Sequence, residues 1–466
     1  MIRRKLIIFY FLVFPFISYA QADNVIKVIG DSLVGKVING ESIREVHGNV
    51  VLTQGKVRIT CLKAVQYLAK NEVELLGKVI VVQDSIVIKT SSGYYYGDSK
   101  TAYSNSGVSL FDGHIKLESR NGFYYTNEKK AYFFDSVILK DKGSTLRTER
   151  LHYFNDDDKL IASGNVKVVD STSTVYSDSL IHNRKDQISF AFKNVKVFDP
   201  KNKLAIFGNN LENYQSEKYS KMIGNPLMIK IDTTDNGELD TLFISARIME
   251  SFNDSTDKLI ATDSVRIFRG EVSSVNNYTL YFRNKDNLLT LKRENDILPP
   301  VLWNENSQLI GDTVNILLED NRLKEMKINS NASIVSVNKK YDNKFDQISG
   351  KQIKLFFGEI GLERTEVFGS VLSIYYLFED GEPNGLLKSS SENAFIYFNE
   401  NEVSDVKFYG NPSSEYHPEN IIIGKEKEFT IPTFRIIENR PNRESFLSER
   451  SSLLLSLIKE IEAYGK

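Results

Sequence analysis

The feature that most constrains this chain is a sequence repeat with a fixed period of 29 residues. Three apolar columns keep this step, without a slip in register, between about residue 48 and residue 223. They are Val50, Val79, Val108, Val137, Val166 and Val195; Leu52, Val81, Leu110, Leu139, Val168 and Val197; and Ile59, Ile88, Leu117, Leu146, Val175 and Leu204. A period of this size is typical of stacked identical units, each too small to bury its apolar face alone.

Each repeat contains two runs that are typical of β-strands. In the second repeat the runs cover 73–82 and 86–96, and in the third they cover 101–111 and 115–125. Val, Ile, Thr, Tyr and Phe dominate the runs, apolar residues lie two positions apart, and the turns between the runs are polar. This period of two predicts strands with one apolar face, and it disfavours a helical repeat.

Small or turn-forming residues recur near the middle of the runs. In the first run they are Gly48, Gly77, Ser106, Asp135 and Gly164, and in the second they are Ala64, Gly93 and Gly122. Glycine inside a strand often marks a bulge or a bend. We therefore expect many strands to bend at mid-length, so that each lies across two facing walls. The predicted fold class is all-β: an elongated bent β-jellyroll, a solenoid-like stack of antiparallel strands with an apolar lining.

The rest of the chain continues this pattern less regularly. The period loosens after Val195, and the stretch from Asp232 to Asp240 is the candidate boundary between two halves. We expect one region of repeats over 23–231 and a second, looser one over 241–437. Residues 442–466 have apolar side chains at helical spacing and predict a short C-terminal helix, which either caps the stack or binds a partner.

The N-terminus resembles a secretory signal. Arg3, Arg4 and Lys5 precede an apolar run over 6–17, and small residues near Ala20 and Ala22 suit cleavage, so 1–22 is the predicted signal peptide. An uncleaved anchor is the competing interpretation, although the run is short for a membrane span. A signal peptide predicts export to the periplasm, and association with the outer membrane there stays open.

Composition and motifs exclude several function classes. The formal net charge of −2 leaves no basic field for nucleic acid, and one cysteine, Cys61, excludes an internal disulfide. The five histidines show no metal-ligand spacing, and no hydrolase, zinc-protease or phosphate-loop motif is present. We therefore expect no enzyme activity, no cofactor and no metal, although carboxylates from different repeats could still meet in space.

At these repeats the chain resembles the OstA/LptA family of periplasmic lipopolysaccharide-transport proteins. The resemblance rests on Gly-Asn-Val at 48–50 and 164–166 and on Gly-Lys-Val at 77–79. It also rests on a Gln or Asp four residues after each valine of the first column: Gln54, Gln83, Asp112, Asp141, Asp170 and Asp199. It is clearest over about 40–230 and weaker to about 435. The chain is much longer than a minimal member of the family, and it leaves too few residues for the C-terminal barrel of the outer-membrane member.

The resemblance implies a hydrophobic interior that shields the acyl chains of lipopolysaccharide on the way to the outer membrane. It also implies stacking of edge strands with other jellyroll proteins of the transport bridge and contact with an outer-membrane assembly protein. Together with the period of two, it predicts an inward, lipid-binding set of side chains: Val50, Leu52, Ile59, Val79, Val81, Ile88, Tyr96, Val108, Leu110, Leu117, Phe123, Tyr125, Val137, Leu139, Leu146, Val166, Val168 and Val175.

Two other functions stay open at this point. A structural or adhesive β-solenoid would bind no lipid, because its inward side chains would only fill one another's space. A carbohydrate-active solenoid would need clustered carboxylates on one outward wall, and the repeats contain no acidic column of that kind.

Overall fold

The computed structural model describes residues 25–233, 239–319, 322–338, 340–400, 402–447 and 451–464. The predicted signal peptide, 1–22, lies outside the described residues. The chain divides into two compact units at residue 142, and each unit is described by itself. The domain limits predicted from the repeats, with a boundary near 232–240, stay a prediction.

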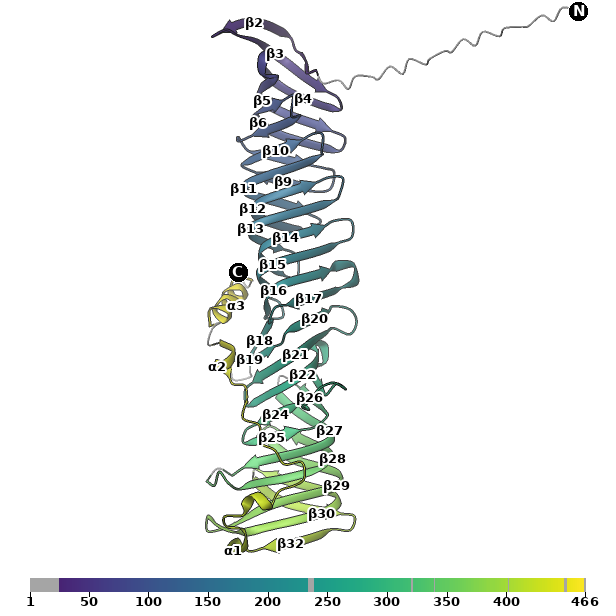
Figure 1. Cartoon of the computed structure of the whole chain (residues 1–466), viewed down its shortest axis with the longest axis vertical. Helices are drawn as coiled ribbons and strands as arrows, with labels where there is room; N and C mark the ends of the chain where they lie inside the picture. The colour runs from purple at the N-terminus through teal and green to yellow at the C-terminus, as the bar shows by residue number, and fades with distance from the viewer. Residues whose placement is uncertain are drawn as a thin grey trace, which may run out of the picture. The chain divides into compact units, whose positions relative to one another are not determined.

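The first unit is a stack of antiparallel strands joined by short turns (Figure 1). Among its described residues, Leu68–Lys70 form one turn of 3-10 helix, η1. The strands are β1 (Lys27–Ile29), β2 (Ser32–Ile38), β3 (Glu41–Gln54), β4 (Val57–Tyr67), β5 (Glu72–Gln83), β6 (Ile86–Tyr96), β7 (Thr101–Ser104), β8 (Val108–Phe111), β9 (Lys116–Ser119), β10 (Asn121–Tyr125) and β11 (Lys130–Asp141).

The second unit repeats this architecture and adds helices near its C-terminus. Its first strands are β12 (Ser144–Phe154), β13 (Lys159–Val169), β14 (Thr174–Asn183), β15 (Ile188–Asp199), β16 (Leu204–Tyr214), β17 (Tyr219–Ile223), β18 (Leu227–Thr233), β19 (Leu239–Ser245), β20 (Ile248–Phe252), β21 (Lys258–Arg269) and β22 (Val272–Phe282). Then follow β23 (Asn287–Leu291), β24 (Val301–Asn304), β25 (Ser307–Ile310), β26 (Thr313–Glu319), β27 (Arg322–Val337), β28 (Phe345–Phe357), β29 (Leu362–Glu379), β30 (Glu382–Asn399), β31 (Glu402–Tyr409) and β32 (Ser413–His417). Single turns η2 (Gln215–Glu217), η3 (Arg283–Lys285) and η4 (Glu426–Glu428) accompany the helices α1 (Glu419–Ile422), α2 (Arg443–Leu447) and α3 (Ser451–Tyr464).

The prediction of an all-β stack with 29-residue repeats and a C-terminal helix is confirmed. Within the described ranges, none of the helices combines the length and the apolar character that crossing a bilayer requires.

Four of the five predicted bends of the first run lie where two consecutive residues adopt the left-handed backbone region; the exception is Ser106, where only the next residue, Gly107, has a positive φ, of 79°. Gly48 and Asn49 have φ of 73° and 45°, and Gly77 and Lys78 have φ of 77° and 50°. The strand register shifts at these pairs, between His47 and Val50 and between Leu76 and Val79. Glycine reaches a positive φ without steric cost, which explains why it recurs there.

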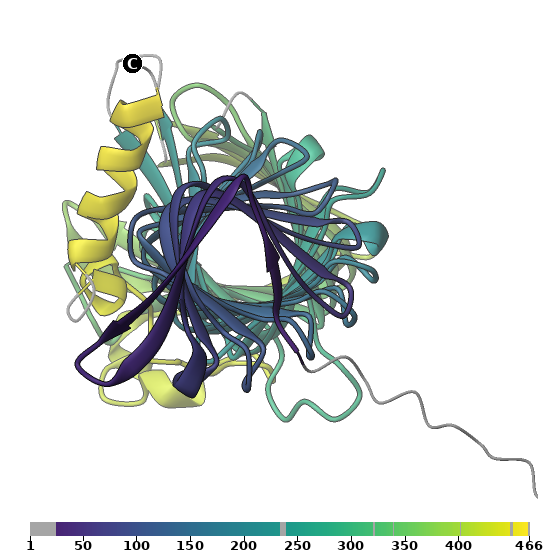
Figure 2. The ribbon, with the colours of Figure 1, turned by 90° about the horizontal axis from the view of Figure 1, so that it is seen from above.

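The bends divide each strand between two walls. In β3, residues 41–47 lie in the first wall and residues 50–54 in the second. In β5, residues 72–76 lie in the first wall and residues 79–83 in the second. The next strand returns through both walls in the opposite direction, and Figure 2 shows the strands of the first unit arranged around one axis in this way. We call the line where the far ends of the two walls meet, opposite the bends, the seam.

The bends of the second run were predicted at the wrong residues. The register of β4 breaks between Thr60 and Lys63, and β6 leaves Ser91 unpaired against β5, two positions before Gly93. Gly93 itself lies within the first wall, where a Cβ atom would stand 2.5 Å from the carbonyl oxygen of Tyr103. This glycine is therefore needed for the close approach of the next strand and not for a bend.

Candidate functional site

The aliphatic columns form one continuous row on the inner face of the first unit. Cross-strand partners face the same side of a sheet, and in this row they run Leu52, Ile59, Val81, Ile88, Leu110, Leu117, Leu139. Every predicted inward aliphatic residue of this unit is buried, and these are Val50, Leu52, Ile59, Val79, Val81, Ile88, Val108, Leu110, Leu117, Val137 and Leu139. The structure thus brings the predicted aliphatic residues together on the concave side.

The three predicted inward aromatic residues, Tyr96, Phe123 and Tyr125, lie on the outer face instead. Tyr95 and Tyr124, their neighbours in the chain, are the buried inward residues, at 0% and 2% exposure. The period of two was extended through a bulge, and the extra residue at each bend moves all later side chains to the other face. The prediction that these three aromatic side chains line the interior is therefore wrong.

Aromatic side chains gather on this outer face of the first wall. The rings of Tyr103 and Phe123 stack at 4.5 Å between centroids, and Phe123 also stacks on Tyr125 and Phe134 at 6.3 and 6.1 Å. Lys130 Nζ lies 5.0 Å from the ring centroid of Tyr125. Stacking between neighbouring strands favours aromatic residues on this face, such as Tyr96 and Tyr125, which are one period of 29 residues apart.

Side chains from both walls close the seam of the first unit. Gln54 ends β3 in the second wall, and its Nε2 donates a 3.1 Å hydrogen bond to the carbonyl of Gly97, just beyond β6 in the first wall. The hydroxyl of Tyr95 donates to Gln54 Oε1 at 2.5 Å. One repeat later, Gln83 Nε2 donates to the carbonyl of Thr126 at 3.0 Å.

The second of these closures repeats the first in detail. Tyr124 donates its hydroxyl proton to Gln83 Oε1 at 2.7 Å. Outside it, Lys129 Nζ pairs with Asp84 at 3.0 Å between the turns of the two walls. The glutamines that the sequence placed in polar turns are thus buried side chains that join the walls. We call these contacts the seam latches.

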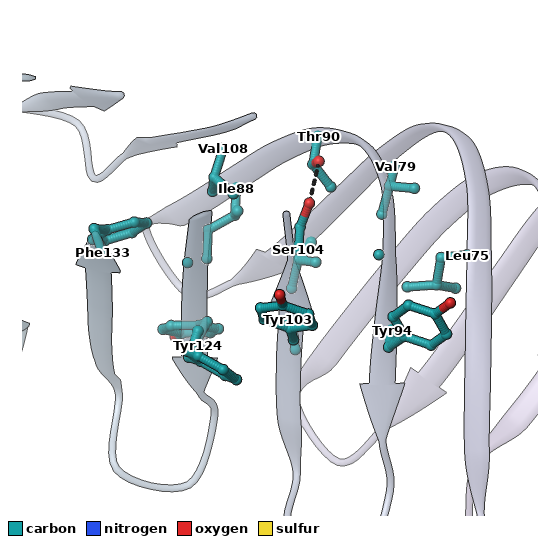
Figure 3. A pocket seen from close by; sticks show the side chains of 15 residues that line it. Leu75, Val79, Ile88, Thr90, Tyr94, Tyr103, Ser104, Val108, Tyr124 and Phe133 are labelled. Carbon is teal, nitrogen blue, oxygen red and sulfur yellow. Dashed lines mark hydrogen bonds between the residues drawn. The ribbon is translucent and has the colours of Figure 1, made fainter. Parts of the chain in front are cut away.

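The interior of the first unit is nearly filled by its own side chains. A cavity of about 20 Å³ lies near the bend, between Val79, Ile88 and Val108 (Figure 3). Thr90 and Ser104 line it as well, with a hydroxyl–hydroxyl distance of 2.7 Å. A space of this size is near that of one water molecule, so this cavity does not accommodate an acyl chain in this structure.

In the second unit a charged cluster closes part of the seam. Lys230 Nζ from β18 lies 3.3 Å from the hydroxyl of Tyr281 in β22 and 3.4 Å from Asp286, which follows β22. Arg269 pairs with Asp232 at 3.3 Å and with Asp240 at 2.7 Å. Burial raises the pKa of Tyr281 to about 12, so its hydroxyl stays protonated near neutral pH.

Some predicted inward residues of the second unit are buried, and others are partly exposed. Leu146 and Val166 are buried at 5% and 2% exposure. Val168 and Val175, which pair with each other in the same inner row, are partly exposed, as is Val197 beside them. The inner face is thus accessible to solvent along β13, β14 and β15, unlike the same row in the first unit.

The C-terminal segment lies along the outer face of the second wall in the second unit (Figures 1 and 2). We call residues 418–447 and 451–464 the C-terminal strap. Phe446 and Leu457 of the strap pack with Phe207, Ile229 and Phe243 in one buried cluster. The same face continues toward the C-terminal strands, where other strap residues cover it: Ile437 contacts Val301, Trp303 and Ile310, and Ile422 and Ile431 contact Ile374, Tyr376 and Leu386.

Sequence reasoning missed the strap, although the strands beneath it carry a signal for it. Residues 204–207 and 227–229 are uninterrupted apolar runs, which indicate strands buried on both faces. Hydrogen bonds fix the strap as well: Gln308 Oε1 accepts from the backbone N–H of Ile437 at 2.8 Å, and Gln347 Oε1 accepts from that of Ile431 at 3.0 Å. The helix thus packs on its own chain, at the side of the stack.

Among the described residues, no group of His, Cys, Asp and Glu side chains has the arrangement of a metal site. The arrangement that recurs is a row of aliphatic side chains enclosed by two walls. Such a row can hold an apolar chain by exclusion from water, and it offers no acid, base or nucleophile to a substrate.

Comparison with known proteins gives a family model and matching solved structures. Residues 23–113 and 98–149 match the sequence model of a family described as OstA-like protein. Among the solved structures that match is LptH of Pseudomonas aeruginosa, the LptA-homologous periplasmic component of a lipopolysaccharide transport device. It is 16% identical, the match covers 32% of this chain and 97% of that chain, and the TM-score is 0.17. A search of curated proteins gives no match.

Proposed function

We propose that this chain is a non-enzymatic, lipid-binding carrier of lipopolysaccharide in transport to the outer membrane. The premise is that it belongs to the OstA-like family, whose sequence model matches residues 23–113 and 98–149. The acyl chains would lie along the inner aliphatic row, and the sugar phosphates would stay at the seam, in water. The observation that carries this proposal is the row itself, which has an aliphatic residue at each step across β3, β4, β5, β6, β8, β9 and β11.

Burial of an acyl chain would offset the release of the seam latches when the walls open. Each methylene that leaves water gains about 0.8 kcal/mol, so ten methylenes gain about 8 kcal/mol. A hydrogen bond of a seam latch contributes about 1 kcal/mol net, and the first unit has four of them at Gln54 and Gln83. The free energy gained by burial of one acyl chain therefore exceeds the free energy lost on release of both latches. The contacts that the walls lose when they separate reduce this difference.

The proposal includes the periplasm as the place of action and stacking as the mode of assembly. The predicted signal peptide supports export. Strand β2 is exposed along its whole length, with Leu33, Val37 and Ile38 in water. Its described pairing is with β3 alone. An open, apolar strand edge is typical of a surface that adds a strand from another protein, so other jellyroll proteins of a transport bridge, and an outer-membrane assembly protein, are the proposed partners.

A binding measurement with matched ligands tests the proposal. The chain from Asp23 onward, freed of detergent, would be titrated with lipopolysaccharide and with fully deacylated lipopolysaccharide, and the complexes would be counted by native mass spectrometry. We expect a complex with the acylated form only. Equal binding of both forms, or of neither, by protein shown to be folded would refute the acyl-chain carrier.

A structural β-solenoid that binds no lipid is the second candidate, because the interior of the first unit is nearly filled in this structure. The same titration separates the two. Substitution of Leu110 by Asp would abolish binding by a carrier, whereas a purely structural solenoid would show no binding before or after the change.

A further inference from the structure

We propose that acyl chains enter and leave the second unit sideways, through the seam beside Val168, Val175 and Val197, which we call the portal. This inference rests on the proposed function and adds a location to it. The ligand class is an aliphatic chain attached to a polar head group.

Burial changes along a single inner row of the second unit. Cross-strand pairing joins Leu146, Val168, Val175, Val197 and Ile206 in this order. The two ends of this series are buried, at 5% exposure for Leu146 and 9% for Ile206, whereas the three valines between them are partly exposed. Nearer the bend, Val166 and Val195 are buried at 2% and 1%. The exposed part of the interior therefore lies on the seam side and has defined limits along the stack.

The residues of the seam at this level differ from those of the seam latches. In the first unit the latch joins a glutamine to a tyrosine 41 residues later, as Gln54 to Tyr95 and Gln83 to Tyr124. The same offset from Asp170 leads to Leu211, which has no hydroxyl group to donate. Asp170 instead accepts hydrogen bonds within its own turn, from the backbone N–H groups of Thr172 at 2.7 Å and Ser173 at 2.8 Å.

The first wall of the second unit carries polar side chains near the seam. His182 and Ser189 are partly exposed there, and His182 Nδ1 lies 2.9 Å from Ser189 Oγ. Asn213 and Ser220, in the next strands of this wall, are also partly exposed. Polar groups at the edge and aliphatic groups behind them match an amphiphile whose chain is buried and whose head group stays in water.

The cluster around Lys230 sets the limit of the portal along the chain. Lys230, Tyr281 and Asp286 join the two walls through contacts of 3.0 to 3.4 Å, so the seam is closed again at β18 and β22. An acyl chain admitted beside Val175 can therefore reach the buried side chains of Val166 and Val195 in the same unit without release of these charged contacts.

Cysteine alkylation tests the portal in the full mature chain. Cys61 is buried and is the only cysteine, so a Cys61→Ser background gives single-cysteine variants. Val175→Cys is the portal variant, Lys196→Cys is the control on the outer face of the same wall, and Leu139→Cys is the buried control from the first unit. Each variant would react with N-ethylmaleimide and with N-dodecylmaleimide, with and without lipopolysaccharide.

We expect V175C to react at least tenfold faster with N-ethylmaleimide than L139C. We also expect the ratio of the N-dodecylmaleimide rate to the N-ethylmaleimide rate to be at least tenfold higher at V175C than at K196C. Lipopolysaccharide should slow alkylation at V175C only. Reaction of V175C as slow as that of L139C, or equal reagent preference at V175C and K196C, would overturn the portal. If mass spectrometry shows bound lipopolysaccharide but V175C is not protected, the portal fails while the carrier function stands; absence of any lipopolysaccharide complex refutes both.

A second variant tests the cause that we assign to the opening. Asp170→Gln with Leu211→Tyr restores the residue pair of a seam latch at the portal. We expect this double change to slow alkylation of V175C at least fivefold and to leave K196C unchanged. An unchanged rate at V175C, in a protein with the same unfolding transition, would contradict the role of the latch position.

Discussion

The hydroxyl of Tyr95 donates a 2.5 Å hydrogen bond to Gln54 Oε1 across the seam of the first unit, although 41 residues separate the two in the chain. Tyr124 and Gln83 repeat this relationship one period later. The walls of this unit are thus joined by backbone at the bend and by buried side chains at the seam. The first prediction concerns this contact.

Tyr95→Phe removes one hydroxyl from the latch and keeps the ring. We expect a loss of about 1 kcal/mol in the free energy of unfolding, because the Oε1 of buried Gln54 loses a donor. Tyr94→Phe is the matched control on the outer face, where the residue is 38% exposed, and it should change stability by less than about 0.5 kcal/mol. Urea unfolding checks both, and equal effects of the two changes would contradict the latch.

Gly93→Ala tests the close approach of strands in the first wall. The new Cβ atom would stand 2.5 Å from the carbonyl oxygen of Tyr103, so the backbone must shift. We expect a destabilisation of about 1–3 kcal/mol, as for an overpacked core. Gly35→Ala is the control, because nothing lies within 4 Å of its Cβ position, and thermal unfolding of the two variants gives the comparison. A neutral Gly93→Ala would show that the wall spacing differs from this structure.

Phe446→Ala tests whether the strap stabilises the second unit. Phe446 is 6% exposed and stacks on Phe243 with 5.5 Å between ring centroids. We expect a loss of about 3–5 kcal/mol, together with faster proteolysis of the strap. Leu455→Ala changes a residue of α3 that is 61% exposed and should be nearly neutral. A neutral Phe446→Ala would mean that the strap is not held on this face in solution.

Asp346 provides a pH-dependent contribution to stability. Burial raises the pKa of its carboxyl to about 6, although the backbone N–H of Tyr376 donates to it at 2.8 Å. Because the folded pKa lies above the unfolded value near 3.8, the folded state binds more protons between about pH 4 and 6. Stability from this group is therefore present below pH 4 and is lost as the pH rises through 6.

Asp346→Asn removes this titration and keeps an acceptor for Tyr376. We expect the variant to be more stable than the parent chain at pH 7, by at most about 3 kcal/mol and by less where water screens the charge. The difference should shrink toward zero near pH 4. Urea unfolding at pH 4, 5, 6 and 7 measures this slope, and a constant difference at all four pH values would contradict the raised pKa.

The sequence predicts the aliphatic interior well because the columns at Val50, Leu52 and Ile59 do not cross a bulge within the second wall. It fails for Tyr96 and Tyr125, since a single unpaired residue such as Ser91 inverts every later side chain. Periodicity alone does not reveal such a residue. The bends at Gly48 and Gly77 were predictable because a positive φ selects glycine.

The strap and the latches depend on contacts between distant residues, which no local pattern encodes. Gln308 bonds to Ile437 across 129 positions, and Gln54 bonds to Gly97 across 43. In sequence a strand end and a turn look alike, so the pattern predicts polar turns at the positions of the buried glutamines. The portal valines have the same residue type as their buried equivalents, so their exposure follows only from the structure.

Photocrosslinking in cells tests the central claim most directly. One photoreactive residue would replace Leu110, which is fully buried on the inner face, and a second would replace its neighbour Ser109, which is partly exposed on the outer face. The carrier account predicts lipopolysaccharide adducts at position 110 and none at position 109. Adducts at neither position, in a protein shown to be folded and exported, would contradict it and favour a structural solenoid.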